Sequence, residues 1–376
     1  MKTAGIYIHF PFCENKSIYC DYYSLEKREK DIPYFVEMLM REIELTAKDH
    51  KKNWFFDTIY FGGGSPALLS PNNVKDILNK LNHHFNISET IELTVEVNPR
   101  ETTKENLFSF KELGINRLSI GFQSLDPDLL TTLSRTHIPD DCFTIYEDAR
   151  DAGFENISVD MMYNIPGQSV ENWLKDLKIL IEIKPDHIAA YPLIVEEGIP
   201  LFNRIKSGEI IPLPEGTELE MFTQANKFLA NSGFIQYEIA HFTKSGKECK
   251  HNQHYWNLEP YLAFGPSAHG YDGRKRWWNV SSLDDYLSKL FINEKPVIDC
   301  ETLSSKNQFN ETVIYGLRTN NGISMEKLRK FETKVPLESS LKKWKDHLKI
   351  SKEAICIKSG HYHLADEIAT DMMVAD

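Results

Sequence analysis

The chain has 376 residues, of which 41% are hydrophobic and 26% are charged, and its formal net charge is −12 at pH 7. These proportions are ordinary for a soluble globular protein and predict a sizeable core, in one large domain with a smaller one or in two of ordinary size. The acidic balance argues against a nucleic-acid partner, and no apolar stretch is long enough to span a bilayer.

The N-terminal segment "MKTAGIYIHFPFC" contains a lysine and then a short apolar run. His9 and Pro11 interrupt this run and no small-residue cleavage site follows, so it predicts a first strand rather than a signal peptide. The six cysteines are scattered over the chain and do not suggest a disulfide framework. We therefore expect a cytoplasmic protein without an integral membrane segment.

Short apolar runs, several of them β-branched, alternate with amphipathic helical segments over the first 245 residues. The predicted strands are Gly5–His9, Thr58–Phe61, Glu92–Val97, Arg117–Gly121, Asn156–Met161 and His187–Tyr191. Strands that alternate with helices of this length predict parallel βα units. Six such units predict an α/β domain over residues 1–245, either an incomplete barrel or a doubly wound sheet.

Five of the predicted strands are followed directly by segments rich in Gly, Pro, Asn and Gln. In chain order these segments are "PFC", "GGGSP", "NPR", "FQS" and "YNIPGQ". Turn-forming residues are common in any βα loop. In both architectures, however, functional residues gather at the carboxyl ends of the strands, so five polar segments in succession predict a shared cleft.

The pattern changes after residue 245, and residues 246–376 predict a smaller, mostly helical domain. Helical segments precede a predicted hairpin, "AICIKSGHYHLA", which turns at Ser359–Gly360. This order suggests a winged-helix-like domain. Its basic and acidic residues are balanced and no basic recognition helix is evident, so we expect a role in packing or protein docking rather than in DNA binding.

The first strand leads into a loop that carries two cysteines, Cys13 and Cys20, with Ser17 between them. Thiolates are the usual ligands of iron–sulfur clusters because soft sulfur matches iron and sulfide. Three thiolates can hold three irons of a 4Fe–4S cube and leave the fourth iron open for S-adenosylmethionine (SAM). A cysteine at position 17 would complete that set.

The motifs around this loop make a much more specific match than the two cysteines alone. "IYIHFPFC", "YCDYYS", "YFGGGSPALL", "TVEVNP", "GINRLSIGFQS" and "YNIPGQS" resemble, in order and spacing, the coproporphyrinogen oxidase-like branch of the radical SAM superfamily. "QYEIAHF", "CKHNQHYW", "YLAFGPSAHGY" and "IYGLRTNNGI" are similar to the HemW-type haem chaperones within that branch. The resemblance covers nearly the whole chain and implies an incomplete (β/α)6 TIM-like barrel.

The resemblance also implies roles for individual residues. Cys13 and Cys20 match two cluster ligands, and Ser17 occupies the place of the third. The positions that match SAM-contacting residues are Tyr7, Tyr19, Gly64, Ser65, Glu96, Gln123, Arg135 and Asp160. Taken singly, the strand-end acids could be helix caps and the arginine a surface ion pair.

The segment "HNQHYW" is a separate group, linked to haem binding in the family that it resembles. His251 and His254 are candidate iron ligands, and the aromatic residues after them could face a porphyrin. A pair of histidines is weak support, because a surface turn or a helix start would carry the same residues. Cys249 is another conceivable ligand, although a buried, idle thiol is the simpler interpretation.

Ser17 changes what the resemblance predicts. A serine hydroxyl is far less acidic than a thiol and is a poor anionic ligand for iron, so we expect a weakly held cluster and little or no reductive SAM cleavage. Two origins are open: an engineered substitution, or a natural lineage that has lost the cluster.

Three functions remain open at this point. The first is a HemW-type haem-binding or haem-transfer protein, with a haem-accepting respiratory protein as a candidate partner. The second is an oxygen-independent coproporphyrinogen III oxidase-like enzyme, and the third is a SAM-binding pseudoenzyme. The first is favoured because the cluster strand begins near residue 1, without the longer segment that precedes it in the oxidases, and because "HNQHYW" is present.

Overall fold

The structure is a computed structural model that describes residues 2–49, 54–331 and 337–374. Its largest element is a twelve-stranded sheet with the order β14-β13-β12-β11-β1-β4-β5-β6-β7-β8-β10-β9. Six central strands are parallel to one another: β1 (Lys2–Phe10), β4 (Trp54–Gly63), β5 (Ile87–Val97), β6 (Arg117–Gln123), β7 (Ile157–Tyr163) and β8 (His187–Pro192). Each of them contains most or all of one predicted strand.

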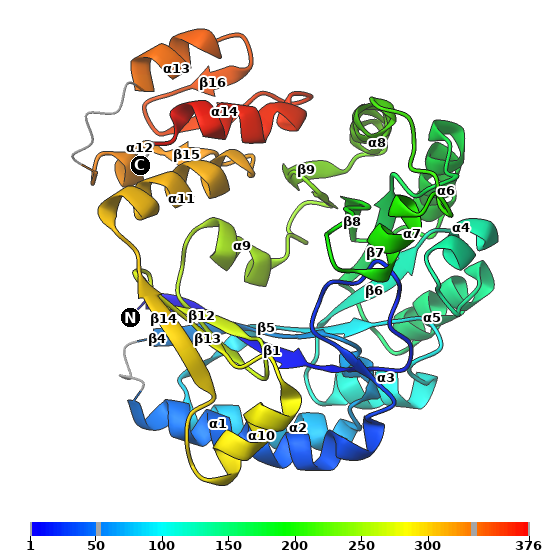
Figure 1. The fold of residues 1–376 in the computed structure, drawn as a ribbon, viewed down its shortest axis with the longest axis vertical. Helices are drawn as coiled ribbons and strands as arrows, with labels where there is room; N and C mark the ends of the chain where they lie inside the picture. The colour runs from blue at the N-terminus through cyan, green and yellow to red at the C-terminus, as the bar shows by residue number, and fades with distance from the viewer. Residues whose placement is uncertain (1, 50–53, 332–336, 375–376) are drawn as a thin grey trace.

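These six strands follow one another in the sheet in the same order as in the chain. A doubly wound sheet reverses its strand order at a switch point, and this sheet does not. Within the described residues the two edge strands of the sheet, β14 and β9, do not pair with each other, and the sheet curves without closing (Figure 1). The predicted α/β fold with an incomplete (β/α)6 barrel is therefore confirmed.

The connecting helices lie mainly on the outer, convex side of the sheet (Figure 1). They are α1 (Ile32–Asp49), α2 (Pro71–His84), α3 (Lys104–Glu112), α4 (Pro127–Thr132), α5 (Pro139–Asp151), α6 (Val170–Glu182), α7 (Pro200–Lys206) and α8 (Thr217–Asn231). Ser70, Thr103 and Ser169 begin α2, α3 and α6 as N-caps, and the oxygen of each side chain accepts a backbone N–H three residues on.

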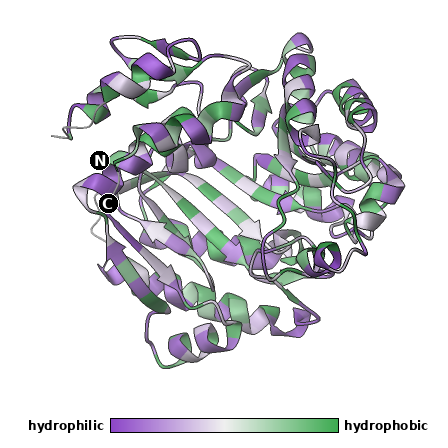
Figure 2. Ribbon diagram, turned by 45° about the horizontal axis from the view of Figure 1, so that its top comes forward, coloured by the Kyte–Doolittle hydropathy of each residue, from purple (hydrophilic) through white to green (hydrophobic). Residues whose placement is uncertain are grey.

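The central strands have one face toward these helices and the other toward the barrel interior. Hydrophobic and paler or polar residues alternate along them in Figure 2, as the period of two of a β-strand requires. On β7, for example, Val159 and Met161 are fully buried in the core, whereas Ser158 and Asp160 face the interior.

Strands that follow residue 245 extend the same sheet beyond β1. They are β11 (Tyr261–Phe264), β12 (His269–Tyr271), β13 (Lys275–Asn279) and β14 (Val297–Thr302), with α10 (Leu283–Phe291) before the last. At the other edge lie β9 (Ile235–Glu238) and β10 (His241–Thr243). The predicted boundary between residues 245 and 246 falls within the chain that builds this one sheet, and the division into 1–245 and 246–376 stays a prediction.

The buried carboxylate of Glu42 in α1 joins this extension to the barrel. It accepts hydrogen bonds from Gly265 N (2.9 Å), Asn279 Nδ2 (2.6 Å) and the Tyr286 hydroxyl (2.6 Å). Burial raises the pKa of Glu42 to about 7, although the three hydrogen bonds act to lower it.

The last part of the chain forms helices around a small sheet of order β15-β17-β16. Its elements are α11 (Ser305–Leu317), β15 (Ile323–Ser324), α12 (Met325–Leu328), α13 (Leu337–Lys343), β16 (Leu348–Ile350), β17 (Ala354–Ile357) and α14 (Ala365–Met372). The sheet with its helices agrees with the predicted winged-helix-like unit.

The hairpin predicted around Ser359–Gly360 is wrong. β17 pairs with β16, which precedes it, and after Gly360 the chain enters a 3-10 turn (Tyr362–Leu364) and then α14. The buried residues of α14 are Ala365, Ile368, Ala369 and Met372, which is helical rather than strand spacing. The short alternation in "HYHLA" is compatible with a strand, but the apolar residues that follow it continue at helical spacing.

Candidate functional site

A cavity of about 620 Å³ opens where the parallel strands end at their carboxyl termini. The predicted site residues that line it are Tyr7, Cys13, Ser17, Tyr19, Cys20, Gly64, Ser65, Glu96, Gln123, Arg135, Asp160 and His251. His254 is not among the residues that line this cavity. The structure therefore brings together all but one of the predicted residues, which lie up to 244 positions apart in the chain.

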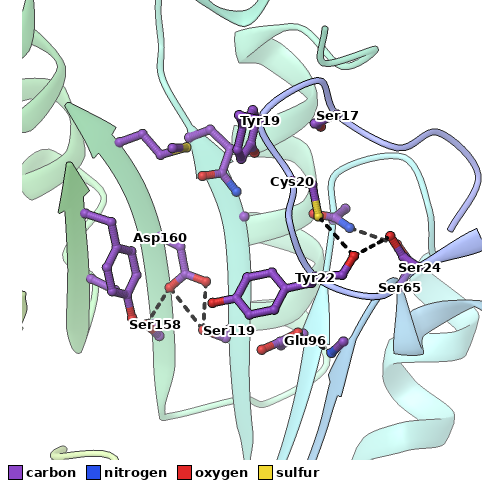
Figure 3. A pocket seen from close by; sticks show the side chains of 18 of the residues that line it. Ser17, Tyr19, Cys20, Tyr22, Ser24, Ser65, Glu96, Ser119, Ser158 and Asp160 are labelled. Atoms are coloured by element: carbon purple, nitrogen blue, oxygen red, sulfur yellow. Dashed lines mark hydrogen bonds between the residues drawn. The ribbon is translucent and has the colours of Figure 1, made fainter. Parts of the chain in front are cut away.

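The cysteine loop covers one side of this cavity. Cys13 belongs to β2 (Phe12–Cys13), which pairs with β3 (Leu25–Glu26), and its thiol is buried. Burial raises the pKa of Cys13 to about 11. Cys20 is partly buried, its backbone N–H donates to the Ser17 carbonyl (3.0 Å), and Ser17 is itself buried. All three positions of the predicted cluster line the cavity, and Figure 3 shows Ser17 and Cys20 on the loop.

The side chains of this loop do not supply the three thiolates that hold a 4Fe–4S cube in the superfamily. Two are thiols and the third is the Ser17 hydroxyl, a hard and weakly acidic donor. Within the described ranges, no group of three or more His, Cys, Asp or Glu side chains could hold a metal ion. The donor set therefore does not fit a cluster with three protein ligands.

The turn "GGGSP" fits closely against this loop. Gly64 N donates to the Phe10 carbonyl and Ser65 N to the Phe12 carbonyl, each over 2.7 Å. A Cβ atom on Gly64 would lie 2.3 Å from the Phe12 carbonyl oxygen, so no larger residue fits there without a backbone shift. The glycine brings the turn after β4 to the loop that carries the cysteines.

Two partly buried carboxylates face the cavity from β5 and β7. Glu96 accepts from the Tyr60 hydroxyl (2.9 Å) and from Gly63 N (3.2 Å). Asp160 accepts from the hydroxyls of Ser119 (3.0 Å) and Ser158 (3.1 Å). Burial raises the pKa of Glu96 to about 7 and also raises the pKa of Asp160. Neither side chain caps a helix, which was the alternative role considered for them.

Three more predicted residues lie around the same opening. Arg135 Nη2 donates to Asn98 Oδ1 over 2.7 Å, so this arginine does not form the surface ion pair that was its alternative. Gln123 ends β6 with a positive φ of 67°, which turns its side chain at the end of the strand. Burial raises the pKa of Tyr19, while the charge of Arg135 acts to lower it, so the two side chains are close. Tyr7 shares a 3.1 Å hydrogen bond with His9 Nδ1.

The histidines of "HNQHYW" lie on α9 (Lys250–Trp256), a short helix on the inner side of the sheet (Figure 1). His251 is 1% exposed and lines the cavity, with Nδ1 2.8 Å from Thr58 Oγ1 and Nε2 2.9 Å from the Tyr255 hydroxyl. Burial lowers its pKa far below the usual value, so its ring is neutral. The segment is therefore buried and is not a surface turn.

His254 has a different environment. Its Nε2 lies 2.7 Å from Asp57 Oδ1 and its Nδ1 lies 2.5 Å from Glu259 Oε2. Burial acts to lower the pKa of His254, but the two carboxylates outweigh it and raise the pKa to about 9. This ring is a buried cation with a carboxylate at each nitrogen. Cys249, which begins α9, is 1% exposed, and burial raises its pKa to about 12.

Several cavity residues were not identified from the sequence. They are Tyr22, Tyr60, Asn98, Arg117, Ser119, Ser158, His187, Tyr191 and His241. Figure 3 shows the Tyr22 side chain extending from the loop toward Asp160 and Ser119. The period of two along each strand could have indicated the strand residues, because Arg117, Ser119, Gly121 and Gln123 all line the cavity from alternate positions of β6.

The chain is similar in sequence to several known proteins. The family model described as the radical SAM superfamily matches residues 7–180. Heme chaperone HemW of Bacillus subtilis is 35% identical over 329 residues, which cover 87% of this chain and 86% of the relative. The mitochondrial radical S-adenosyl methionine domain-containing protein 1 of Danio rerio is 32% identical, over 89% of this chain and 77% of the relative.

A solved structure has the same fold. Coproporphyrinogen III oxidase (HemN) from Escherichia coli, a radical SAM enzyme, superposes with a TM-score of 0.86 over 99% of this chain and 90% of its own, at 20% identity. No helix in the part of the chain that the structure describes is long and apolar enough to cross a membrane.

Proposed function

The chain belongs to the HemW family of the radical SAM superfamily, and from this membership we propose that it binds SAM in the cavity at the strand ends and binds and transfers haem. We further propose that it holds a cluster weakly and carries out little or no reductive SAM cleavage. The observation that carries the proposal is that residues from five strands and their loops, at the SAM positions of the family, line one cavity that also contains Ser17.

The chemistry of the cavity supports SAM as a ligand. SAM offers ribose hydroxyls and an ammonium group as donors, and Glu96 and Asp160 are acceptors for them. Arg135 is a donor for the methionine carboxylate, and charge-assisted hydrogen bonds of this kind are the strong ones. The volume of about 620 Å³ lies within the usual range for sites of small ligands.

The proposal for the cluster rests on Ser17. Two thiols and one hydroxyl give one thiolate fewer than the superfamily uses, so iron should be held weakly. The same reasoning argues against an active coproporphyrinogen oxidase, even though the fold is that of HemN. Decarboxylation of coproporphyrinogen by a Ser17→Cys variant would promote the oxidase alternative.

The proposal for haem rests on the relatives named heme chaperone HemW and on His251. Iron needs a neutral imidazole with an available nitrogen, and His251 is neutral and lines the cavity. To bind iron, its Nε2 would give up the hydrogen bond that it shares with the Tyr255 hydroxyl. His254 is protonated between two carboxylates and is the poorer ligand.

Two titrations test the proposal. Calorimetry with SAM should give saturable binding to the wild type and weaker binding to an Asp160→Asn variant. Haemin titrated into the wild type should shift the Soret band; His251→Ala should weaken this shift, and His254→Ala should keep it. The absence of a Soret shift in the wild type would overturn the haem proposal, and the absence of heat with SAM would overturn the SAM proposal.

A further inference from the structure

Arg117, the first residue of β6, is a buried cation that faces the cavity. Its side chain is 2% exposed and lines the cavity wall. Within the described residues its guanidinium makes no hydrogen bond and no ion pair within 4.0 Å, and its Nε is buried without a partner. A guanidinium has five N–H donors and stays protonated, so a buried one without acceptors is rare.

The strand register places Arg117 near the floor of the cavity. It is paired with Thr94, whereas Ser119, two residues further along β6, is paired with Glu96 on one side and with Ser158 on the other. Arg117 therefore lies deeper in the barrel than Glu96. His251, on the inner helix α9, lines the cavity as well. Its ring is hydrogen-bonded to Thr58, which belongs to the first half of β4, so His251 also lies deep in the barrel.

The carboxylates of this region are already used by other donors. Glu92 accepts from the backbone N–H groups of Lys250 and His251, each over 3.1 Å. Glu96 and Asp160 accept from the hydroxyl and backbone donors described above. Their charges offset that of Arg117 through space, but none of them is in hydrogen-bonding contact with the guanidinium.

The histidines that line the deep part of the cavity do not add a second cation. His251 is neutral, and burial lowers the pKa of His187 far below its usual value as well. His187 is bonded through its two nitrogens to Ser158 (2.8 Å) and to the Tyr237 hydroxyl (2.8 Å). The floor therefore offers one charged, unpartnered donor group to whatever enters the cavity, and the ligand that matches it is an anion.

We propose that Arg117 binds a carboxylate of the tetrapyrrole, a propionate side chain of haem, through its planar N–H groups. This inference rests on the proposed haem function. A guanidinium and a carboxylate match in shape and charge and form two parallel hydrogen bonds. The SAM carboxylate is the other carboxylate source in the cavity, but Arg135 lies at the strand ends with the other SAM positions, above the level of Arg117.

The test compares haemin with haemin dimethyl ester, which keeps the iron and the ring and removes both negative charges. The wild type should bind haemin about tenfold more tightly than the ester, as expected for a charge-assisted hydrogen bond. In Arg117→Met the two ligands should bind equally, and Arg117→Lys should keep part of the preference. Arg100→Met, an exposed arginine outside the cavity, is the matched control and should keep the full preference.

A purely structural arginine would alter folding or both ligands alike, but not the ratio of haemin to ester. Equal binding of the two ligands by the wild type overturns the inference without any variant. An unchanged ratio of haemin to ester affinity in Arg117→Met overturns it too. If the same variant also loses affinity for SAM, the guanidinium is assigned to SAM instead. If the wild type binds neither haemin nor its dimethyl ester, the proposed haem function fails and this inference fails with it. If the wild type binds both with similar affinity, only this inference fails.

Discussion

The Tyr60 hydroxyl donates a 2.9 Å hydrogen bond to Oε1 of Glu96, and burial nevertheless raises the pKa of this carboxyl to about 7. Glu96 is thus partly protonated at neutral pH, because the cost of burying its charge outweighs the gain from the bond. The proposed contact with SAM requires the ionised form of Glu96, so the protonation of this side chain should set the affinity of the site for SAM.

We expect SAM to bind more tightly as the pH rises from 6 to 8, by up to about tenfold, because the ionised fraction of Glu96 rises over this range. Calorimetric titrations with SAM at several pH values measure this. Glu96→Gln should bind weakly and lose the pH dependence, and Glu112→Gln, on the outer surface, should behave as the wild type. A pH profile shared by the wild type and Glu96→Gln would contradict the assignment.

Ser17→Cys should raise the cluster content after anaerobic reconstitution with iron and sulfide. The wild type should take up substoichiometric, labile iron, whereas the variant should approach ~4 Fe and the charge-transfer absorbance of a cube. Ser207→Cys is the matched control, since it adds a thiol at an exposed position outside the cavity. A stable, nearly full cluster in the wild type would show that two thiols suffice.

His254→Ala should lower the free energy of unfolding by about 3 kcal/mol at pH 6, since it leaves Asp57 and Glu259 without their buried partner. The pKa of His254 is raised to about 9, so its contribution is full below about pH 6.5 and is lost as the pH rises through 9. Denaturant unfolding at pH 6 and pH 10 measures this. The exposed His83→Ala is the control, and a penalty independent of pH would contradict the ion-pair role.

The raised pKa of Glu42 predicts a fall in stability with rising pH as well, but over a lower pH range than for His254. Its pKa of about 7 lies above its ordinary value, so between about pH 4.5 and 7 the folded protein keeps a proton that the unfolded chain has released, and stability falls as the pH rises. Glu42→Gln should remove this component, so its stability relative to the wild type should improve by about 1–3 kcal/mol from pH 5 to pH 8. The free energy of unfolding is measured in urea at several pH values. If it changes with pH to the same extent in the two proteins, the assignment is refuted.

Much of this protein was predictable because its signals are local. Short apolar runs, several of them β-branched, predicted six strands, and their alternation with helices predicted parallel βα units. The resemblance to radical SAM proteins then favoured an incomplete barrel over a doubly wound sheet. The polar segments after the strands predicted where the site lies, since parallel strands end on one side of the sheet. The spacing of Cys13 and Cys20 around Ser17, with the resemblance, predicted a cluster loop that lacks one thiol, and this stays a prediction.

The tertiary structure decided what depends on residues far apart in the chain. His251 and His254 are equivalent in "HNQHYW", and they differ only because Thr58 and Tyr255 surround one ring and Asp57 and Glu259 the other. Arg117 is an ordinary arginine in the sequence, and its proposed role depends on a fold in which none of the described residues accepts a hydrogen bond from its guanidinium. Ionisation and ligand binding depend on burial and on the neighbouring charges, and folding alone determines those neighbours.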